Sequence, residues 1–283
     1  MEKENKILIV GHRGLLGQEL LIQLLPLGRL AGVDVETCDI TRPEQIGGVL
    51  DSVRPGWVIN TAAYTDVDGC ESIPETARAV NEVGAGNLAR SCRDRDIGIV
   101  QLSTDFVFDG RKGAEYNEDD GPAPLSIYGE SKLGGERQVI EIGGRYIIVR
   151  TSWLFGKGGK NFPDTIIKAA RSSDSLRVVS DQTGSPTYAV DLANAIGELI
   201  RKDARGIVHV TNRGYCSWAE YAKFVLKISG IDTEVIPVST VELSRPAVRP
   251  GFSVLSLKKY ETITGKKMRP WQDAVKSYLG ERK

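Results

Sequence analysis

A tyrosine and a lysine four residues apart form the pair with the most distinct chemistry in this sequence. In Leu125-Ser-Ile-Tyr-Gly-Glu-Ser-Lys132, Tyr128 and Lys132 would share one face of a helix, because positions i and i+4 are neighbours there. A phenol with a pKa of about 10 exchanges protons poorly near neutrality, whereas a neighbouring ammonium lowers that pKa. The pair therefore predicts a general acid or base. Since the chain has nine tyrosines, the alternative is a surface helix with a packed ring and a solvated lysine.

Three polar residues close an apolar stretch shortly before this tyrosine. Ile97-Gly-Ile-Val-Gln-Leu102 is predicted to be a buried strand, and Ser103-Thr104-Asp105 follows it. Ligands gather at the carboxyl ends of parallel strands, which makes Thr104 and Asp105 candidates to act with Tyr128. The alternative is that Thr104 caps a strand end and that Asp105 belongs to a turn.

Three glycines open the chain immediately after its first apolar run. Gly11, Gly14 and Gly17 lie between a predicted strand, Ile7–Val10, and a predicted helix from Gln18 to Leu27. Glycines at such a turn allow the backbone to approach a pyrophosphate, and the helix N-terminus offers amide donors to it. The turn predicts a dinucleotide site, with a turn that binds no ligand as the alternative.

The choice of dinucleotide depends on residues near the second strand. Asp34 and Glu36 lie about where an acidic residue would accept a hydrogen bond from the ribose 2′-hydroxyl of NADH, whereas Arg13 could meet the 2′-phosphate of NADPH. We expect NADPH, with NADH as the alternative. Asp39-Ile40 would contact the adenine, and Ala62-Ala63-Tyr64 would wall the adenosine half of the cofactor.

Apolar runs alternate with helical patterns through the first 150 residues. This alternation predicts a Rossmann-type α/β fold with a doubly wound parallel sheet over residues 1–150, and Pro74 to Cys92 is expected to form one long helix. Residues 151–283 are richer in Gly and Pro loops and are expected to form mainly a smaller substrate-binding lobe. Strands near 176–179 and 206–210 are expected to complete the sheet. The strands expected before residue 150 are Ile7–Val10, Val33–Cys38, Trp57–Asn60, Ile97–Leu102 and Tyr146–Arg150.

Composition excludes several other classes. The 283 residues carry 37 basic and 37 acidic side chains, so no general basic surface would attract nucleic acid or membrane. No apolar run has the length of a membrane span, and the N-terminus does not read as a signal peptide. The four cysteines show no C-x-x-C spacing, so we expect neither a metal site nor a disulfide framework from them. A cytoplasmic enzyme is expected.

With these motifs together, the chain resembles the extended short-chain dehydrogenase/reductase superfamily, where the spacing G-x-x-G-x-x-G is found. More closely, it resembles the family of dTDP-4-dehydrorhamnose reductases, and the resemblance covers nearly the whole chain. The segments that carry it are Asn60-Thr-Ala-Ala-Tyr-Thr-Asp-Val-Asp68, Leu102-Ser-Thr-Asp-Phe-Val-Phe-Asp-Gly110, Tyr128-Gly-Glu-Ser-Lys132, Arg150-Thr-Ser-Trp-Leu-Phe155, Asp181-Gln-Thr-Gly-Ser-Pro-Thr187 and Arg245-Pro-Ala-Val-Arg-Pro250.

The resemblance implies roles for individual residues. Tyr128 would donate a proton to the C4 oxygen of a dTDP-linked 4-keto sugar, Lys132 would hold the nicotinamide ribose, and Thr104 would hydrogen-bond the same sugar oxygen. Asp105 and Trp153 would contact substrate with Thr104, while Asn161-Phe162, Arg245 and Arg249 are candidates for its diphosphate. The residues expected at the cofactor are Gly11, Arg13, Gly14, Leu15, Leu16, Gly17, Asp39, Ile40, Ala62, Ala63, Tyr64, Thr65, Leu102, Tyr128 and Lys132.

Some members of this family dimerise through magnesium held by glutamates. Here Val190 stands at the expected ligand position, with Asp191 beside it, and Glu19 alone would not make a site. We therefore predict no metal and leave monomer and homodimer open. The alternatives are another nucleotide-sugar reductase or epimerase, and a cofactor-binding regulatory subunit like the methionine adenosyltransferase beta subunit.

Overall fold

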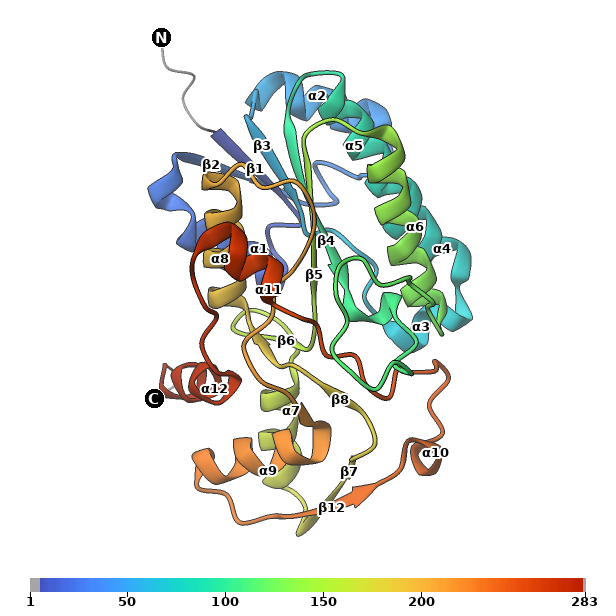
Figure 1. Cartoon of the computed structure of the whole chain (residues 1–283), viewed down its shortest axis with the longest axis vertical. Helices are drawn as coiled ribbons and strands as arrows, with labels where there is room; N and C mark the ends of the chain where they lie inside the picture. The colour runs from blue at the N-terminus through green and yellow to red at the C-terminus, as the bar shows by residue number, and fades with distance from the viewer. Residues whose placement is uncertain (1–5, 282–283) are drawn as a thin grey trace.

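The central sheet has six parallel strands in the order β10-β5-β4-β3-β1-β2. The computed structural model of the chain describes residues 6–281. Because every pair in the sheet is parallel, all six strands direct their carboxyl ends to one edge (Figure 1). The strands are β1 (Lys6–Val10), β2 (Arg29–Val33), β3 (Trp57–Asn60), β4 (Gly98–Thr104), β5 (Tyr146–Thr151) and β10 (Gly206–His209).

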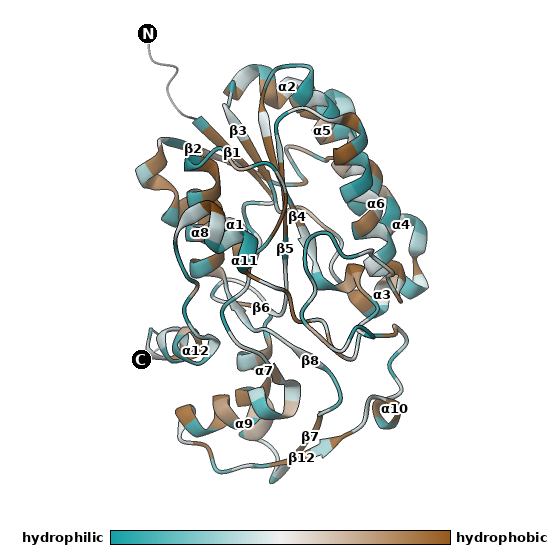
Figure 2. Cartoon of the chain, in the orientation of Figure 1, coloured by the Kyte–Doolittle hydropathy of each residue, from teal (hydrophilic) through white to brown (hydrophobic). Residues whose placement is uncertain are grey.

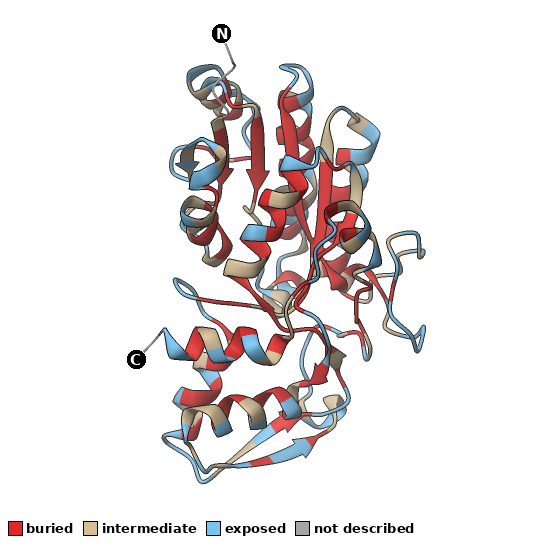
Figure 3. Cartoon of the chain, turned by 60° about the vertical axis from the view of Figure 1, so that its left-hand side comes forward, coloured by how far each residue is buried: buried red, intermediate tan, exposed pale blue. Residues whose placement is uncertain are grey.

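Helices cover both faces of this sheet. Side chains alternate along a strand, so Ile7 and Ile9 enter one apolar core while Leu8 and Val10 enter the other. The colouring in Figures 2 and 3 shows the strands as apolar and buried between the helical layers. The first core lies under α1 (Leu15–Gln23), α8 (Ala189–Arg201) and α11 (Lys258–Thr264), and the second under α2 (Pro43–Val53), α5 (Ala85–Arg93) and α6 (Ile127–Ile142).

The second lobe is built around its own aromatic core. Phe155, Tyr221 and Trp271 are buried in that core. The lobe's strands β7 (Ser175–Val179) and β12 (Glu234–Val238) pair in parallel with each other and pack in a second cluster against α9 residues such as Ala222. Figure 1 places this lobe below the sheet. The lobe's helices are α7 (Phe162–Ala170), α9 (Trp218–Ser229), α10 (Thr240–Leu243) and α12 (Trp271–Gly280), and its short strands are β6 (Leu154–Phe155), β8 (Thr183–Gly184), β9 (Thr187–Tyr188) and β11 (Cys216–Ser217).

Two strand predictions were wrong. The second strand is Arg29–Val33 and not Val33–Cys38, because residues from Asp34 onward turn away at the end of the edge strand. The strand near 176–179 does not complete the sheet, because β7 takes β12 as its partner inside the lobe. The strand near 206–210 does join the sheet, as β10 beside β5.

The helix expected from Pro74 to Cys92 contains a π-helical turn. It runs as α4 (Pro74–Arg78), the π turn η2 (Ala79–Gly84) and α5, and it follows the short helix α3 (Val67–Ser72). Such turns place one extra residue in a helix and occur often at functional sites. Two short 3-10 turns, η1 (Leu25–Leu27) and η3 (Asp105–Val107), complete the described elements. No helix within residues 6–281 combines the length and apolarity that a membrane span requires.

Candidate active site

One face of α6 carries three functional side chains at four-residue intervals. Ser126 begins the helix by accepting a hydrogen bond from the Gly129 amide. Tyr128, Lys132 and Glu136 then follow along the face toward β4, and the buried Lys132 Nζ donates to the Leu102 carbonyl over 2.6 Å. The predicted pairing of Tyr128 with Lys132 on one helix is therefore present.

The buried environment of Lys132 lowers its pKa. Burial disfavours the ammonium and brings the pKa to about 8, while the nearby Glu136 carboxylate acts in the opposite direction. Glu136 is itself held by Arg150 of β5, which donates to both carboxylate oxygens over 2.9 and 2.6 Å. This buried ion pair joins α6 to the sheet directly behind the lysine. Nε2 of the buried His209 on β10 is 3.4 Å from Nη1 of the same arginine, so His209 is part of the core.

The pKa of Tyr128 lies in the direction opposite to the expectation. Burial raises it above the ordinary phenol value, a hydrogen bond with Thr104 lowers it, and the carboxylate of Asp105 raises it further. The neighbouring Lys132 does not lower the pKa of Tyr128 as expected, because the cost of desolvating the phenolate is the largest contribution to that pKa. The ring packs edge-on against Phe106, with centroids 5.5 Å apart. The phenol is consequently protonated at neutral pH.

Asp105 is buried next to Thr104. The Thr104 hydroxyl donates to Asp105 Oδ1 over 3.1 Å, and Ser253 donates to Oδ2. Burial raises the pKa of Asp105 to about 6, although both hydrogen bonds lower it. The whole residue is 1% exposed, so neither its side chain nor its backbone is open to a substrate in this conformation. The Thr104 side chain also accepts from the Phe106 amide, which fixes its position beside Tyr128.

A crevice of about 320 Å³ lies at the carboxyl edge between β1 and β3. The sheet order reverses between these strands, which is where dinucleotides bind in doubly wound folds. Its lining includes these predicted cofactor residues: Gly11, Gly14, Asp39, Ile40, Ala62, Ala63 and Tyr64. The other predicted cofactor residues are not on that lining: Arg13, Leu15, Leu16, Gly17, Thr65, Leu102, Tyr128 and Lys132. Leu16 is packed in the core.

The glycine turn has the geometry that phosphate binding requires. Gly11 has φ +81°, and a Cβ on Gly17 would lie 2.3 Å from the Gly11 carbonyl oxygen, so neither position accepts a larger residue readily. Gly14 precedes α1 without a side-chain cap, and the first turn of α1 has no acidic residue. Its amide donors are thus available to an anion. These features fit a dinucleotide pyrophosphate.

Acidic side chains line the rim beyond the turn. Asp34 directly follows β2, lines the crevice and accepts a hydrogen bond from the Arg13 amide over 3.0 Å. The Arg13 guanidinium pairs with Glu36 over 2.7 Å. Of the two candidates for an acidic ribose marker, Asp34 lines the crevice and Glu36 does not.

Asn81 is a site residue that the sequence patterns did not indicate. It lies in the π turn, where its side chain donates to the Tyr64 carbonyl and to Ser131 Oγ, each over 3.0 Å, and accepts from the Tyr64 amide. Asn81 therefore ties the wall of the crevice to α6 next to Lys132. The signal that marks Asn81 is the π turn itself, which is a feature of the structure and not of the sequence pattern.

A second cavity of about 340 Å³ lies between the sheet edge and the lobe. Its lining includes the aromatic side chains Phe106, Trp153, Phe162 and Trp218. Three arginines, Arg177, Arg245 and Arg249, also line it. Phe106 contacts Tyr128, and Ser253 on the lining contacts Asp105, so the catalytic candidates lie directly behind the lining of this cavity. Asn161 does not line it, because its side chain caps α7 and bonds Tyr278.

Trp153 is held in an unusual conformation within this cavity. Its φ of +46° is rare for a bulky residue and marks strain. The indole stacks on Trp218 with ring centroids 3.5 Å apart, and a Cβ on Gly184 would lie 2.6 Å from the indole Nε1. The face of Trp153 that stacks on Trp218 is therefore closed to a sugar in this conformation.

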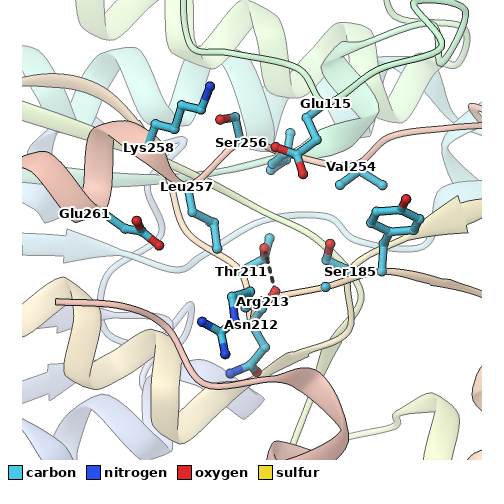
Figure 4. A pocket seen from close by; sticks show the side chains of 13 residues that line it. Glu115, Ser185, Thr211, Asn212, Arg213, Val254, Ser256, Leu257, Lys258 and Glu261 are labelled. Carbon is cyan, nitrogen blue, oxygen red and sulfur yellow. Dashed lines mark hydrogen bonds between the residues drawn. The ribbon is translucent and has the colours of Figure 1, made fainter.

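A smaller hollow of about 190 Å³ lies away from these residues (Figure 4). Loops after β10 and before α11 form it, and Glu115, Arg213, Lys258 and Glu261 mix both signs of charge around it. None of the predicted site residues lines it. Across residues 6–281, the structure contains no group of three or more His, Cys, Asp or Glu side chains placed to hold a metal ion.

The parallel sheet, the glycine turn at its switch point and the Thr104, Tyr128 and Lys132 cluster define an extended short-chain dehydrogenase/reductase. Comparison with known proteins narrows this class: residues 5–283 match the model of the RmlD substrate binding domain, and the chain belongs to that family.

Relatives and solved structures agree over the full length. The chain is 39% identical to the spore coat polysaccharide biosynthesis protein SpsK of Bacillus subtilis, covering 98% of each chain. It is 34% identical to dTDP-4-dehydrorhamnose reductase of Escherichia coli, covering 97% of each. The crystal structure of dTDP-4-dehydrorhamnose reductase from Bacillus anthracis in complex with NADP is similar with a TM-score of 0.96 and 37% identity, over 98% of this chain and 99% of that one.

Proposed function

We propose that this chain reduces the C4 ketone of dTDP-6-deoxy-L-lyxo-4-hexulose (dTDP-4-dehydrorhamnose) to dTDP-L-rhamnose, with NADPH as hydride donor and NADH as alternative. The observation that carries the proposal is the cluster at the end of β4: Thr104 hydrogen-bonds the Tyr128 phenol, and Lys132 follows Tyr128 one helical turn along α6. Tyr128 packs against Phe106, which lines the arginine-lined cavity. Membership of the family supports the proposal, as do the reductases of Escherichia coli and Bacillus anthracis, the latter in complex with NADP.

The crevice residues fit the cofactor. The Gly11–Gly17 turn and the uncapped start of α1 would hold the pyrophosphate, and Ala62, Ala63 and Tyr64 would wall the adenosine. Lys132 Nζ uses one proton on the Leu102 carbonyl and keeps the others for the nicotinamide ribose. NADPH, when bound, supplies the hydride that the C4 carbon receives.

Tyr128 is proposed to supply the proton. Its raised pKa keeps the phenol protonated at neutral pH, which is the form that a donor needs. Thr104 hydrogen-bonds the phenol and would orient the C4 oxygen toward it. As negative charge develops on that oxygen, the Tyr128 proton transfers to it, and the ammonium of Lys132 stabilises the phenolate that is left.

The second cavity suits a nucleotide diphosphate joined to a deoxysugar. Its aromatic side chains would pack the apolar face of the sugar, with Trp153 in contact, and its arginines would bind the phosphates. We propose a cytoplasmic enzyme that acts as a monomer or homodimer, with the nucleotide sugar as its small-molecule partner. The family favours the reductase over an epimerase or a regulatory subunit.

Incubation with NADPH and the dTDP-4-keto sugar, followed by loss of NADPH absorbance and product analysis, tests the reaction. Tyr128→Phe removes the proton donor and should lower kcat by about 10²–10⁴-fold, while NADPH binding by fluorescence titration stays within about twofold of wild type, because the phenol is not needed to hold the cofactor. Near-normal kcat in this variant would disprove the mechanism. Turnover of a different nucleotide sugar alone would disprove the substrate and leave the reductase class.

A further inference from the structure

Asp68 connects the nucleotide-binding part of the chain to a loop of the substrate cavity. It lies on α3 and is 24% exposed, and its Oδ2 is 3.0 Å from Arg249 Nη2 and 3.4 Å from Arg245 Nη1. Its Oδ1 accepts a hydrogen bond from the Ala247 amide over 3.2 Å. Arg249 also donates to the Ala247 carbonyl over 2.8 Å. One carboxylate thus gathers both arginines and the backbone between them.

The two arginines are held with different strength. Arg249 is 18% exposed and makes the shorter contact, while Arg245 is 58% exposed and makes the longer one. An exposed pair with a long contact contributes little to stability, so Arg245 can leave Asp68 at small cost. Burial raises the pKa of Asp68, but the hydrogen bonds from Arg249 and the Ala247 amide outweigh it and hold the pKa below its usual value. Asp68 therefore remains charged at neutral pH.

The charge count around this loop favours an anion. Asp68 is a single carboxylate beside two guanidiniums, whereas Arg177 on the same cavity is paired with Glu242 over 2.8 Å. The Asp68 cluster thus keeps an excess positive charge directed at the cavity. A nucleoside diphosphate brings charge of the opposite sign, and arginine forks bind phosphate oxygens well.

We propose that Asp68 is a positioning residue for the diphosphate of the substrate. It fixes Arg249 and the Ala247 backbone against α3, and Arg245 transfers from Asp68 to a phosphate when the substrate enters. This role rests on the proposed function only in that a nucleotide sugar occupies the cavity. Asp68 itself does not contact the substrate, so its loss should weaken binding of phosphates without changing the chemical step.

The test measures the affinity of the full chain, with NADPH present, for dTDP and for thymidine, which lacks the phosphates. A positioning role for the diphosphate affects dTDP alone, whereas a general structural role affects both ligands. Asp68→Asn keeps the shape and an acceptor for the Ala247 amide, but it loses the charge that holds the arginines. We expect its dTDP affinity and its KM for the nucleotide sugar to weaken by about tenfold, with thymidine affinity, kcat and the KM for NADPH within about twofold. Asp51→Asn, which removes a carboxylate paired with the distant Arg95, is the control and should change none of these.

The outcomes distinguish the two proposals. Equal losses for dTDP and thymidine, or no loss for either, would overturn the role of Asp68. If Asp68→Asn fails to fold, the exposed Arg245→Gln should still weaken dTDP and spare thymidine, and its failure to do so would also overturn it. Wild-type protein that binds dTDP through Asp68 but does not turn over the keto sugar would sink the proposed function and leave the positioning role standing. Absence of dTDP binding to wild type would overturn both.

Discussion

The cofactor crevice and the substrate cavity differ in the residues and contacts that form them. Residues between Val10 and Val80 form the crevice, and the small residues Gly11, Gly14 and Ala62 lie on its lining. Side chains from Phe106 to Ser253 form the cavity, and its arginines rest on carboxylates of other segments. The crevice is therefore set by local chain geometry, whereas the cavity is set by pairings that a ligand can rearrange.

The largest effect should come from breaking the local geometry of the crevice. In Gly17→Ala the new Cβ would lie 2.3 Å from the Gly11 carbonyl oxygen and 2.6 Å from His12 Cα, both backbone atoms of the turn. The turn must shift, which should destabilise the fold by about 1–3 kcal/mol and weaken NADPH binding by at least about 100-fold, because amide donors then miss the pyrophosphate. Thermal unfolding and an NADPH titration measure both effects.

Gly14→Ala is the matched control for this change. At Gly14 the added Cβ would lie 3.3 Å from the Gly11 oxygen, and its φ of −67° suits any residue. Its unfolding temperature should therefore stay close to that of wild type, with any loss confined to NADPH affinity. Equal destabilisation by the two alanines would contradict the view that Gly17 is the glycine that the fold itself requires.

Sequence patterns predicted lining residues of both the crevice and the cavity, but not the long-range pairings that hold the cavity. The glycine turn, Tyr128 and Lys132 are encoded by spacing within one segment, so they are visible without a fold. The pairing of Asp68 with Arg249 spans 181 positions, and no local pattern reports it. Asn81 was missed because a π turn placed it at the site.

The two strand errors have physical causes as well. β2 is a half-exposed edge strand that contains Gly32 and begins with Arg29, so its apolar signal is weak. β7 has a convincing strand pattern, but a pattern does not say which strand will be its neighbour. The raised pKa of Tyr128 also needed the fold, because burial and the position of Asp105 determine it.

Asp105 follows β4 and is hydrogen-bonded by Ser253 of the cavity lining. Ionisation of its carboxyl group should destabilise the fold. Burial raises its pKa from 3.8 to about 6, so the native state binds more protons than the unfolded state between these values. The free energy of unfolding should therefore fall as pH rises from about 4 through 6, by on the order of 2–3 kcal/mol for this group. Asp105→Asn should remove that dependence, as urea unfolding from pH 4 to 7 would measure.

Asp39→Asn gives a control of opposite sign. Hydrogen bonds from the Thr41 side chain and amide lower the pKa of Asp39, so this carboxylate stabilises the fold above its unfolded pKa and loses that effect as pH falls. Relative to wild type, Asp39→Asn should thus become less stable as pH rises, and Asp105→Asn more stable. The same trend in both variants would show that neither carboxylate determines the pH response.

The smallest effect should come from a pair of exposed side chains on the glycine turn and after β2, outside the lining of the crevice. Arg13 and Glu36 are 64% and 57% exposed, and such a surface pair is worth about 0–1 kcal/mol. Glu36→Gln should free Arg13 for the 2′-phosphate and raise the ratio of kcat/KM with NADPH to that with NADH by at most about fivefold. Arg13→Gln should lower the ratio by about tenfold, because a hydrogen bond to a charged group is lost.

Asp34 explains why NADH should remain a competent cofactor in both variants. Its carboxylate is fixed by the Arg13 amide and by the Val35 amide, contacts that neither side-chain substitution removes, and it can still accept from a ribose 2′-hydroxyl. The kcat/KM with NADH should consequently stay within about twofold of wild type. A change in the NADH constant as large as that for NADPH would mean that the rim is shaped by Arg13 as a whole, and the crevice would then depend on side-chain pairing as the cavity does.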